Sequence, residues 1–463
     1  MKRTWFTILL MLILAGLVGY LYVVEFPGEQ AKTRKETEEK KLLPFERNEI
    51  TGLTVRASGE DIVLAAGDNG TWKLSAPLQT DADSREVDTI LRALALGKVS
   101  RVLEDQTTAL EPFGLEKPPV MLTVTAGPRK ETIAIGDIGP ISNTLYARRE
   151  SDKKVLLTDL AAKDFLNKRL YTFRKKEVLG FDQTQTERLR LAYPKAEIVL
   201  YRSEQLDKSK RNKWMIRSPI EANADATEVR MLLGKIEELK ALGFVDVGPE
   251  RDAVAKKLSN PTLRVTLYAA GSEQAIKFYQ PDPTSGEAYA VTSPEAPIYR
   301  ISPTVIKDLT RELFALQDKR LLGVEIDDIA MLAVKTREET YTLINQTGTW
   351  VLESKPEEKV DQQKTDLFVS RVVNLPAELL VVKEGGPLAP YGLSSPAAEF
   401  TATGKNGKIK GRVVLGTKTG GLVYAMGGGL PGIYQARMDI LSQIPSTREL
   451  LTKSASDGLP PPS

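Results

Sequence analysis

The sequence predicts an α+β fold in which an N-terminal transmembrane helix precedes three tandem repeats. Three observations predict it. A long uncharged apolar run lies near the N-terminus, a set of residues recurs three times at matching spacing, and each copy combines helical with alternating hydrophobic patterns. Each repeat is expected to contain antiparallel strands and about two amphipathic helices.

The first element is the run of 20 uncharged residues from Trp5 to Val24. A helix of this length spans a bilayer core about 30 Å thick. A cleaved signal peptide is the alternative, because Lys2 and Arg3 precede the run as in such peptides. However, the run is long for a signal peptide and no small-x-small motif ends it. We therefore expect residues 1–24 to be an uncleaved transmembrane anchor.

The charges around the anchor predict its orientation. Lys2 and Arg3 lie directly before it, and the first positive residue after it is Lys32. This favours a cytoplasmic N-terminus, with the bulk of the chain on the periplasmic or extracytoplasmic side of the inner (cytoplasmic) membrane. The further basic residues up to position 41 argue against that orientation. Residues 25–43 alternate charges of both signs, which indicates a solvated tether.

Composition excludes several classes of function. The 463 residues suggest about three domains at about 150 residues each. The absence of cysteine and histidine excludes disulfides, thiolate nucleophiles, Ser-His-Asp triads and metal sites that need these ligands. Lys and Arg total 64 against 61 Asp and Glu, so no nucleic-acid partner is expected. Any catalysis would depend on carboxylates, Lys, Tyr, Ser–Lys pairs or a metal held by oxygen ligands.

An internal repeat decides the predicted domain organisation. Each recurring Asp follows its Trp by 11 residues, and each recurring Tyr follows its Pro by 28. We therefore expect repeats at 44–179, 180–322 and 323–452, followed by a disordered tail at 453–463. The recurring positions are Trp72, Trp214 and Trp350; Asp83, Asp225 and Asp361; Pro118, Pro261 and Pro396; and Tyr146, Tyr289 and Tyr424.

The same order of elements is expected in every repeat. Alternation at 53–56 and 62–64 predicts a hairpin that leads into the Trp strand. Helical spacing at 87–94 and 229–236 predicts an amphipathic helix after that strand. Alternating segments after the recurring proline predict an antiparallel meander. A second helix should close the repeat, most clearly at 302–313, where Ser302 and Pro303 supply a helix start.

The recurring residues are interpreted as structural positions. Each recurring Asp precedes a predicted helix and is expected to cap its N-terminus, although metal binding or acid–base chemistry is the alternative. Each recurring Trp and Tyr is expected in the core, with sugar stacking as the alternative for Trp. The glycines at 420–421 and 427–429 flank a strand, and a ligand loop is their alternative. We predict no catalytic, cofactor-binding or metal-binding residue.

Several motifs recur around the repeated positions. They are Trp72 to Pro77, Trp214 to Pro219, Ala82-Asp83, Ala224-Asp225, Phe113 to Pro118, Tyr391 to Pro396 and the Tyr-Ala strand. Their combination resembles a bacterial family catalogued as a domain of unknown function, number 4340, and Lys257 and Val360 depart from the family pattern. The resemblance implies an N-terminal anchor, an extracytoplasmic body and genes often adjacent to gliding-motility-type ABC-2 transporter components, and it brings no catalytic residue.

These features together predict a non-catalytic binding or scaffolding arm on a single-pass anchor. The resemblance implies an accessory component of an ABC-type, gliding-like transport complex, with an ABC-type permease as the expected partner, and no cofactor is expected. Two alternatives stay open. One is an envelope glycan-processing enzyme that uses two carboxylates, which needs neither His nor Cys. The other is a glycan- or lipid-binding module.

Overall fold

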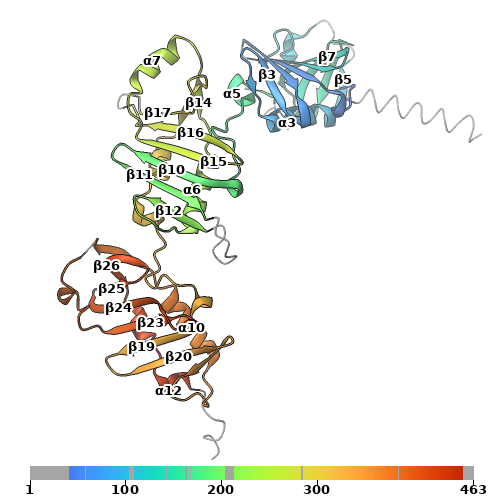
Figure 1. The fold of residues 1–463 in the computed structure, drawn as a ribbon. Helices are drawn as coiled ribbons and strands as arrows, with labels where there is room; N and C mark the ends of the chain where they lie inside the picture. The colour runs from blue at the N-terminus through green and yellow to red at the C-terminus, as the bar shows by residue number, and fades with distance from the viewer. Residues whose placement is uncertain are drawn as a thin grey trace, which may run out of the picture. The chain divides into compact units, whose positions relative to one another are not determined.

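The computed structural model describes residues 41–451 apart from 58, 104–108, 142–143, 152, 162–164, 167, 204–212, 283–284 and 384. The predicted anchor Trp5–Val24, most of the tether 25–43 and the tail 453–463 lie outside the described residues. The chain forms two compact units (Figure 1). Unit 1 contains residues up to Glu177 together with Lys240–Gly243, and unit 2 contains Val178–Leu239 and the chain from Phe244 onward.

Unit 1 contains one nine-stranded antiparallel sheet in the order β4-β3-β2-β1-β6-β7-β8-β9-β5. β1 pairs with both β2 and β6, so two meanders are joined through the first strand. The elements are η2 (Arg47–Glu49), β1 (Gly52–Ala57), β2 (Glu60–Ala66), η3 (Asp68–Gly70), β3 (Trp72–Ala76), β4 (Thr80–Asp81), α3 (Ser84–Leu96), β5 (Val99–Leu103), η5 (Glu111–Phe113), β6 (Val120–Ala126), β7 (Arg129–Ile138), β8 (Leu145–Arg149), β9 (Val155–Thr158) and α5 (Leu170–Phe173).

Helix α3 covers one face of this sheet because β4 and β5, which it connects, lie at opposite edges. Its buried residues Val87, Ile90, Leu91 and Leu94 follow the helical period that the sequence predicts. They pack in one core with the inward residues of the strands. The crossover therefore supplies the hydrophobic layer against which the sheet folds.

Unit 2 contains two further sheets with the same topology. The second sheet has nine strands and the third has eight. The elements around the second sheet are η6 (Gln183–Gln185), β10 (Thr186–Tyr193), β11 (Ala196–Arg202), β12 (Trp214–Ser218), β13 (Ala222–Asn223), α6 (Ala226–Glu237), β14 (Gly243–Val245), α7 (Pro249–Lys257), β15 (Leu263–Ala269), β16 (Ser272–Tyr279), β17 (Ala288–Val291), β18 (Ile298–Ile301), α8 (Thr304–Leu309) and α9 (Leu313–Leu316). Those around the third are η7 (Ile326–Asp328), β19 (Met331–Thr336), β20 (Thr340–Gln346), β21 (Thr349–Leu352), α10 (Gln362–Val373), β22 (Leu379–Val382), η8 (Ala389–Tyr391), β23 (Ala398–Thr403), β24 (Ile409–Thr419), β25 (Leu422–Gly427), β26 (Leu430–Arg437), α11 (Asp439–Ser442) and α12 (Thr447–Leu450).

The predicted α+β fold class is wrong, whereas the transmembrane helix predicted with it lies outside the described residues. Large antiparallel sheets dominate both units, so the fold is β-rich. The long helix in each repeat is present, but the predicted second helix shrinks to short turns such as α5, with 4 residues, and α8, with 6. Among the residues that the structure describes, no helix is both long and apolar enough to cross a membrane.

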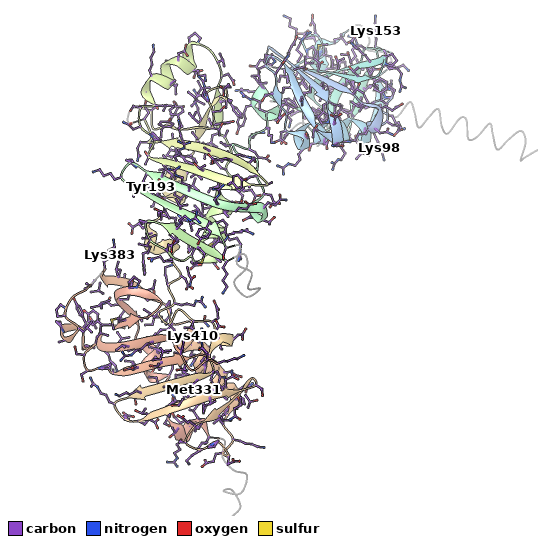
Figure 2. The ribbon with its side chains drawn as sticks, in the orientation of Figure 1. Lys98, Lys153, Tyr193, Met331, Lys383 and Lys410 are labelled. Carbon is purple, nitrogen blue, oxygen red and sulfur yellow. The ribbon has the colours of Figure 1, made fainter. Side chains whose placement is uncertain are left out.

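A tyrosine hydroxyl explains why the helical pattern at 302–313 is interrupted. α8 ends before Thr310, whose backbone is extended. The hydroxyl of Tyr193 (Figure 2) donates to the carbonyl of Arg311 at 3.0 Å and accepts from its N–H at 3.0 Å. These two hydrogen bonds satisfy the backbone of Arg311 outside a helix. The hydrophobic spacing continues across the break, which is why periodicity alone misses it.

The opposite face of the first sheet is partly covered by the turn at Phe113. Phe113 and Leu115 pack there on Ala134 and Val155. The close packing of this turn on the sheet requires a glycine at position 136 in β7, because a Cβ on Gly136 would lie 2.1 Å from the carbonyl oxygen of Phe113. The third sheet repeats the arrangement with Gly416 and Tyr391, again at 2.1 Å.

In the second sheet, a helix packs on the corresponding part of this face instead of a tight turn. Lys257 stands where the motif has Gly114, and Tyr279 follows Phe278 where Gly136 follows Ile135. The chain here forms the nine-residue helix α7, whose Val254 packs on Tyr289 and Ile298. The second repeat therefore lacks both Gly114 and Gly136 of the first repeat, and it has a helix in place of the tight turn.

Candidate functional site

The recurring tryptophans lie in the cores. Trp72, Trp214 and Trp350 are 6%, 6% and 2% exposed, and each is the first or second residue of its strand. A ring this deeply buried presents no face on which a sugar could stack.

The recurring tyrosines and prolines lie around the second face of each sheet. Tyr146 and Tyr424 are half-buried and make edge-to-face contacts with Phe113 and Tyr391, at centroid distances of 4.8 and 5.0 Å. Tyr289 is buried in the corresponding cluster. The prolines, all half-buried, each precede a strand by two residues: Pro118, Pro261 and Pro396 before β6, β15 and β23.

The recurring aspartates occupy the N-cap positions of α3, α6 and α10. Asp225 Oδ1 accepts from the N–H groups of Thr227 and Glu228 at 2.9 and 3.1 Å. Asp361 Oδ1 accepts from the N–H of Lys364 at 3.0 Å. These bonds satisfy helix amides that otherwise have no partner.

Asp83 differs, because its side chain makes no capping bond. Its Oδ2 instead accepts from Lys176 Nζ at 3.3 Å. Its backbone N–H donates to the carbonyl of Phe173 at 2.8 Å, and Asp225 and Asp361 make the same bond to Leu316 and Leu450. The recurring Asp therefore joins the start of the long helix to the closing turn of its repeat.

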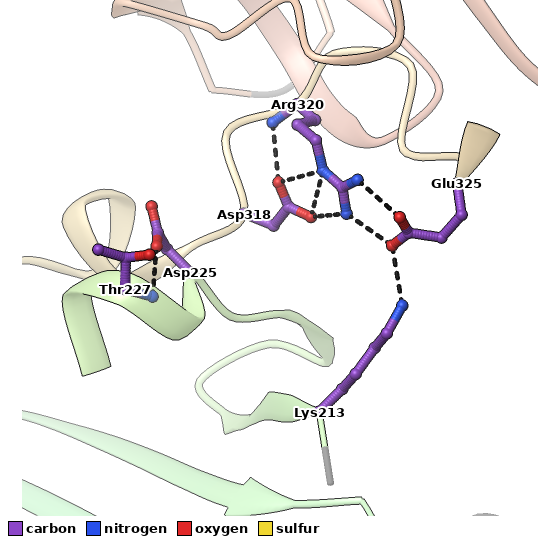
Figure 3. Close-up of polar contacts among 6 residues, drawn as sticks. All are labelled: Lys213, Asp225, Thr227, Asp318, Arg320 and Glu325. Atoms are coloured by element: carbon purple, nitrogen blue, oxygen red, sulfur yellow. Dashed lines mark hydrogen bonds and ion pairs between the residues drawn. The ribbon is translucent and has the colours of Figure 1, made fainter. Parts of the chain in front are cut away.

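One candidate site is a cavity of about 800 Å³ in unit 2. Its walls include Trp214, Asp225 and Lys410, and the connecting segment 318–325 between the second and third sheets lies along it. Figure 2 labels Lys410, and Figure 3 shows Asp225 together with Asp318, Arg320 and Glu325. The remaining lining residues are Ser203, Lys213, Met215, Asn223, Ala224, Ala226, Asp328 and Pro376. The cavity therefore lies where the recurring Trp and Asp of one repeat meet the start of the next.

Four charged side chains form one network at this cavity (Figure 3). Arg320 donates through Nη2 and Nε to Asp318 at 2.6 and 3.0 Å, and through Nη1 and Nη2 to Glu325 at 3.1 and 3.0 Å. Lys213 Nζ donates to Glu325 Oε1 at 2.8 Å. One guanidinium thus bridges two carboxylates with the paired geometry that arginine favours.

The network fixes the charge of Glu325. Hydrogen bonds from Arg320 and then Lys213 lower the pKa of the Glu325 carboxyl to about 2, against the opposing effect of burial. Hydrogen bonds to Asp318 and then to Glu325 raise the pKa of Arg320. Glu325 is consequently ionised throughout the physiological range and acts as a fixed charge, not as a proton donor.

A smaller cavity of about 300 Å³ occupies the equivalent position in unit 1. Trp72, Asp83 and Lys176 line it where Trp214, Asp225 and Lys319 line the larger one. Because both cavities form at corresponding residues, they follow from the repeated topology. Their other charged side chains differ, and the unit 1 cavity is the more basic, with Lys73, Arg85, Lys175 and Lys240.

The described carboxyl groups whose pKa is clearly shifted include none with the raised pKa of a glycosidase general acid. Within the described part of the chain, every carboxyl group with a clearly shifted pKa has it lowered, with hydrogen bonding as the largest cause. These are Glu49, Asp61, Asp182, Glu325, Glu399 and Glu449. A general acid in such an enzyme has a raised pKa. Over the same described ranges, no cluster of three or more acidic side chains could hold a metal ion.

The glycines at 427–429 accommodate the backbone of the connecting segment. A Cβ on Gly427 would lie 2.1 Å from the carbonyl oxygen of Leu321, and one on Gly411 would lie 2.4 Å from that of Leu322. The N–H of Gly429 donates to the Leu321 carbonyl at 3.0 Å. Close backbone approach therefore explains Gly427 and Gly429 without a ligand.

Sequence reasoning missed the charge network. The signal was the charged run Asp318-Lys319-Arg320, followed by Glu325 a few residues later. Runs with charges of both signs are common on solvated surfaces, so only the fold identifies which of these charges meet.

A family model described as "Domain of unknown function (DUF4340)" matches the chain at residues 21–118, 72–261, 214–386 and 350–454. The four matches overlap and together extend over most of the chain, consistent with internal repeats. Comparisons with curated proteins and with solved structures give no match.

Proposed function

The chain belongs to the DUF4340 family, and from this premise we propose that it is a single-pass membrane-anchored envelope protein acting as a non-catalytic binding or scaffolding arm. Its partner would be the permease of an ABC-type, gliding-like transport complex. The proposal combines an anchor, a set of β-rich repeats and the contacts that join neighbouring repeats.

The anchor component rests on the sequence. The uncharged run Trp5–Val24 is long enough to span a bilayer, and Lys2 and Arg3 before it favour a cytoplasmic N-terminus. The β-rich repeats would then lie on the extracytoplasmic side, where a chain without cysteine cannot form unwanted disulfides.

The observation that carries the scaffolding role is the connection between the second and third sheets within unit 2. A flexible linker would leave its polar groups to solvent. Here Leu321 and Leu322 are 0% and 1% exposed, and Arg320 forms an isolated β-bridge with Pro376. The Leu321 N–H donates to the Leu375 carbonyl at 2.9 Å. Such packing suits a protein whose binding surfaces must keep a fixed spacing.

The experiment is affinity purification of the tagged full-length protein from its own membranes in mild detergent, followed by mass spectrometry. We expect an ABC-type permease and its ATPase in near-stoichiometric amounts. The matched control replaces residues 1–24 with a cleavable signal peptide, which should release the body from the membrane and reduce the recovery of the permease. Recovery of the full-length protein alone, or an anchor replacement that stays in the membrane, would contradict the proposal.

A further inference from the structure

The second sheet carries an arginine–tyrosine surface on the side opposite α6. In β10, Leu189 and Leu191 point into the core, so Arg188 and Arg190 point outward. The neighbouring strands β11, β12 and β15, which Figure 1 labels, lie in the same sheet. Their burial patterns add four further outward residues. We define the Arg–Tyr face as Arg188, Arg190, Tyr201, Arg217, Arg264 and Tyr268.

The strand register places Tyr201, Arg188 and Tyr268 side by side at the centre of the Arg–Tyr face. Arg188 pairs with Tyr201 on one side and with Tyr268 on the other. The guanidinium carbon of Arg188 lies 4.3 Å from the ring centroid of Tyr268, and that of Arg217 lies 4.6 Å from the ring of Tyr201. These are cation–π distances, so the arginines are held over the tyrosine rings.

The fold does not require these residue types. The row Tyr201, Arg188, Tyr268 corresponds in the first sheet to Ala65, Gly52 and Thr125. In the third sheet it corresponds to Ile344, Met331 and Thr403, and Figure 2 labels Met331. Neither of the other two sheets places a cation or an aromatic ring at these positions, although all three share one topology. The Arg–Tyr face is therefore an addition to the repeat.

The Arg–Tyr face carries more guanidinium groups than its ion-pair partners neutralise. Arg190 is paired with Glu197, at 2.6 Å between Nε and Oε1. Arg188, Arg217 and Arg264 are exposed, and no carboxylate within the described ranges forms an ion pair with them. An exposed guanidinium offers a planar fork that matches a carboxylate. Arginine and tyrosine are also enriched where proteins bind one another.

We propose that the Arg–Tyr face docks an acidic segment of a partner protein. Carboxylates of the partner accept from the guanidinium groups of Arg188, Arg217 and Arg264, while the edges of Tyr201 and Tyr268 pack against its side chains. A protein suits this surface better than a sugar polymer, because two guanidinium groups already cover ring faces on which a sugar would stack. This inference rests on the proposed function and specifies the chemistry of the partner.

The test uses the full-length protein in detergent and a fluorescent glutamate-rich peptide as the probe. We expect the peptide to bind, and to bind less tightly as salt is raised. Arg188→Glu should weaken binding at least about tenfold, or about 1.4 kcal/mol. Lys130→Glu makes the same charge change at an exposed position of β7 in the first sheet and should leave binding unchanged.

Further variants make the result specific. Arg188→Lys keeps the charge without the fork and should fall between wild type and Arg188→Glu. Unchanged peptide binding in Arg188→Glu, equal loss in Lys130→Glu, or binding of polygalacturonate without binding of the peptide would overturn the proposal. If the peptide does not bind while the permease still co-purifies, the docking surface is wrong and the proposed function stands.

Discussion

The carboxylate of Glu325 faces the guanidinium of Arg320 through two hydrogen bonds of 3.1 and 3.0 Å. Between these residues, Gly323 adopts a positive φ of 67°. A Cβ at Gly323 would lie 2.5 Å from the Cα of Gly429. The ion pair therefore closes a turn that only glycine can occupy, and it ties the start of the third repeat to Lys213 in the second.

Arg320→Ala should loosen the connecting segment. It removes the shared partner of Asp318 and Glu325, and because Arg320 and Asp318 are 24% and 17% exposed, we expect unit 2 to lose about 1–2 kcal/mol. The check is faster hydrogen exchange across residues 318–325. Lys355→Ala breaks the exposed pair with Glu358 and should cost less than about 0.5 kcal/mol. Equal exchange in both variants would contradict this prediction.

Acid should weaken the same contact within a defined pH range. The pKa of Glu325 is lowered to about 2 from an ordinary value of 4.5, chiefly by the hydrogen bond from Arg320. A lowered pKa stabilises the folded state above pH 4.5, and this contribution disappears as pH falls from 4.5 toward 2. Thermal unfolding across this range should show a steeper loss of stability in the wild type than in Glu325→Gln. Parallel profiles for the two proteins would refute the assignment.

Gly136→Ala should destabilise the first sheet. The added Cβ would lie 2.1 Å from the Phe113 carbonyl oxygen, so the turn must move away from the sheet at a cost of about 1–3 kcal/mol. Gly421→Ala is the matched control, because a Cβ there meets nothing within 4 Å. Chemical denaturation of the two variants measures the difference. A small effect at Gly136 would show that the turn is not tightly packed.

The N-cap of α6 offers a test that distinguishes hydrogen bonding from charge. Asp225→Ala removes two bonds to helix amides and should cost about 1 kcal/mol. Asp225→Asn keeps an oxygen acceptor and should recover most of that loss. Asp83→Ala should cost α3 less than Asp225→Ala costs α6, because Asp83 makes no capping bond. Hydrogen exchange in the first turns of α3 and α6 reports each effect separately.

Sequence patterns predicted the repeated order of helices and strands better than the amount of helix relative to strand. Apolar residues at Val87, Ile90 and Leu94 identified the long helix because only its inward face contacts the sheet. The pattern around Leu309 and Leu313 was equally helical, yet the Tyr193 hydroxyl holds Arg311 in an extended segment. A contact across 118 residues of sequence leaves no local signal.

The candidate site was predictable only in part. The recurring Trp214 and Asp225 are visible as a motif, and both line the larger cavity. The role of Lys213 depends on the approach of Glu325, 112 residues later, which no spacing rule anticipates. The Arg–Tyr face was likewise missed, because its rows emerge only when the strand register is known.

The bond from the Asp83 N–H to the Phe173 carbonyl has a consequence for the order of folding. Phe173 follows Asp83 by 90 residues, so each repeat stays open at its helix start until its last turn has been synthesised. Pairing of β5 with β9 imposes a similar delay. Contacts of such long sequence separation slow folding, because loop closure must precede them. Each repeat can therefore complete its fold only after its C-terminal residues have been synthesised. A ribosome stalled inside a repeat would leave a sheet with an unfinished edge.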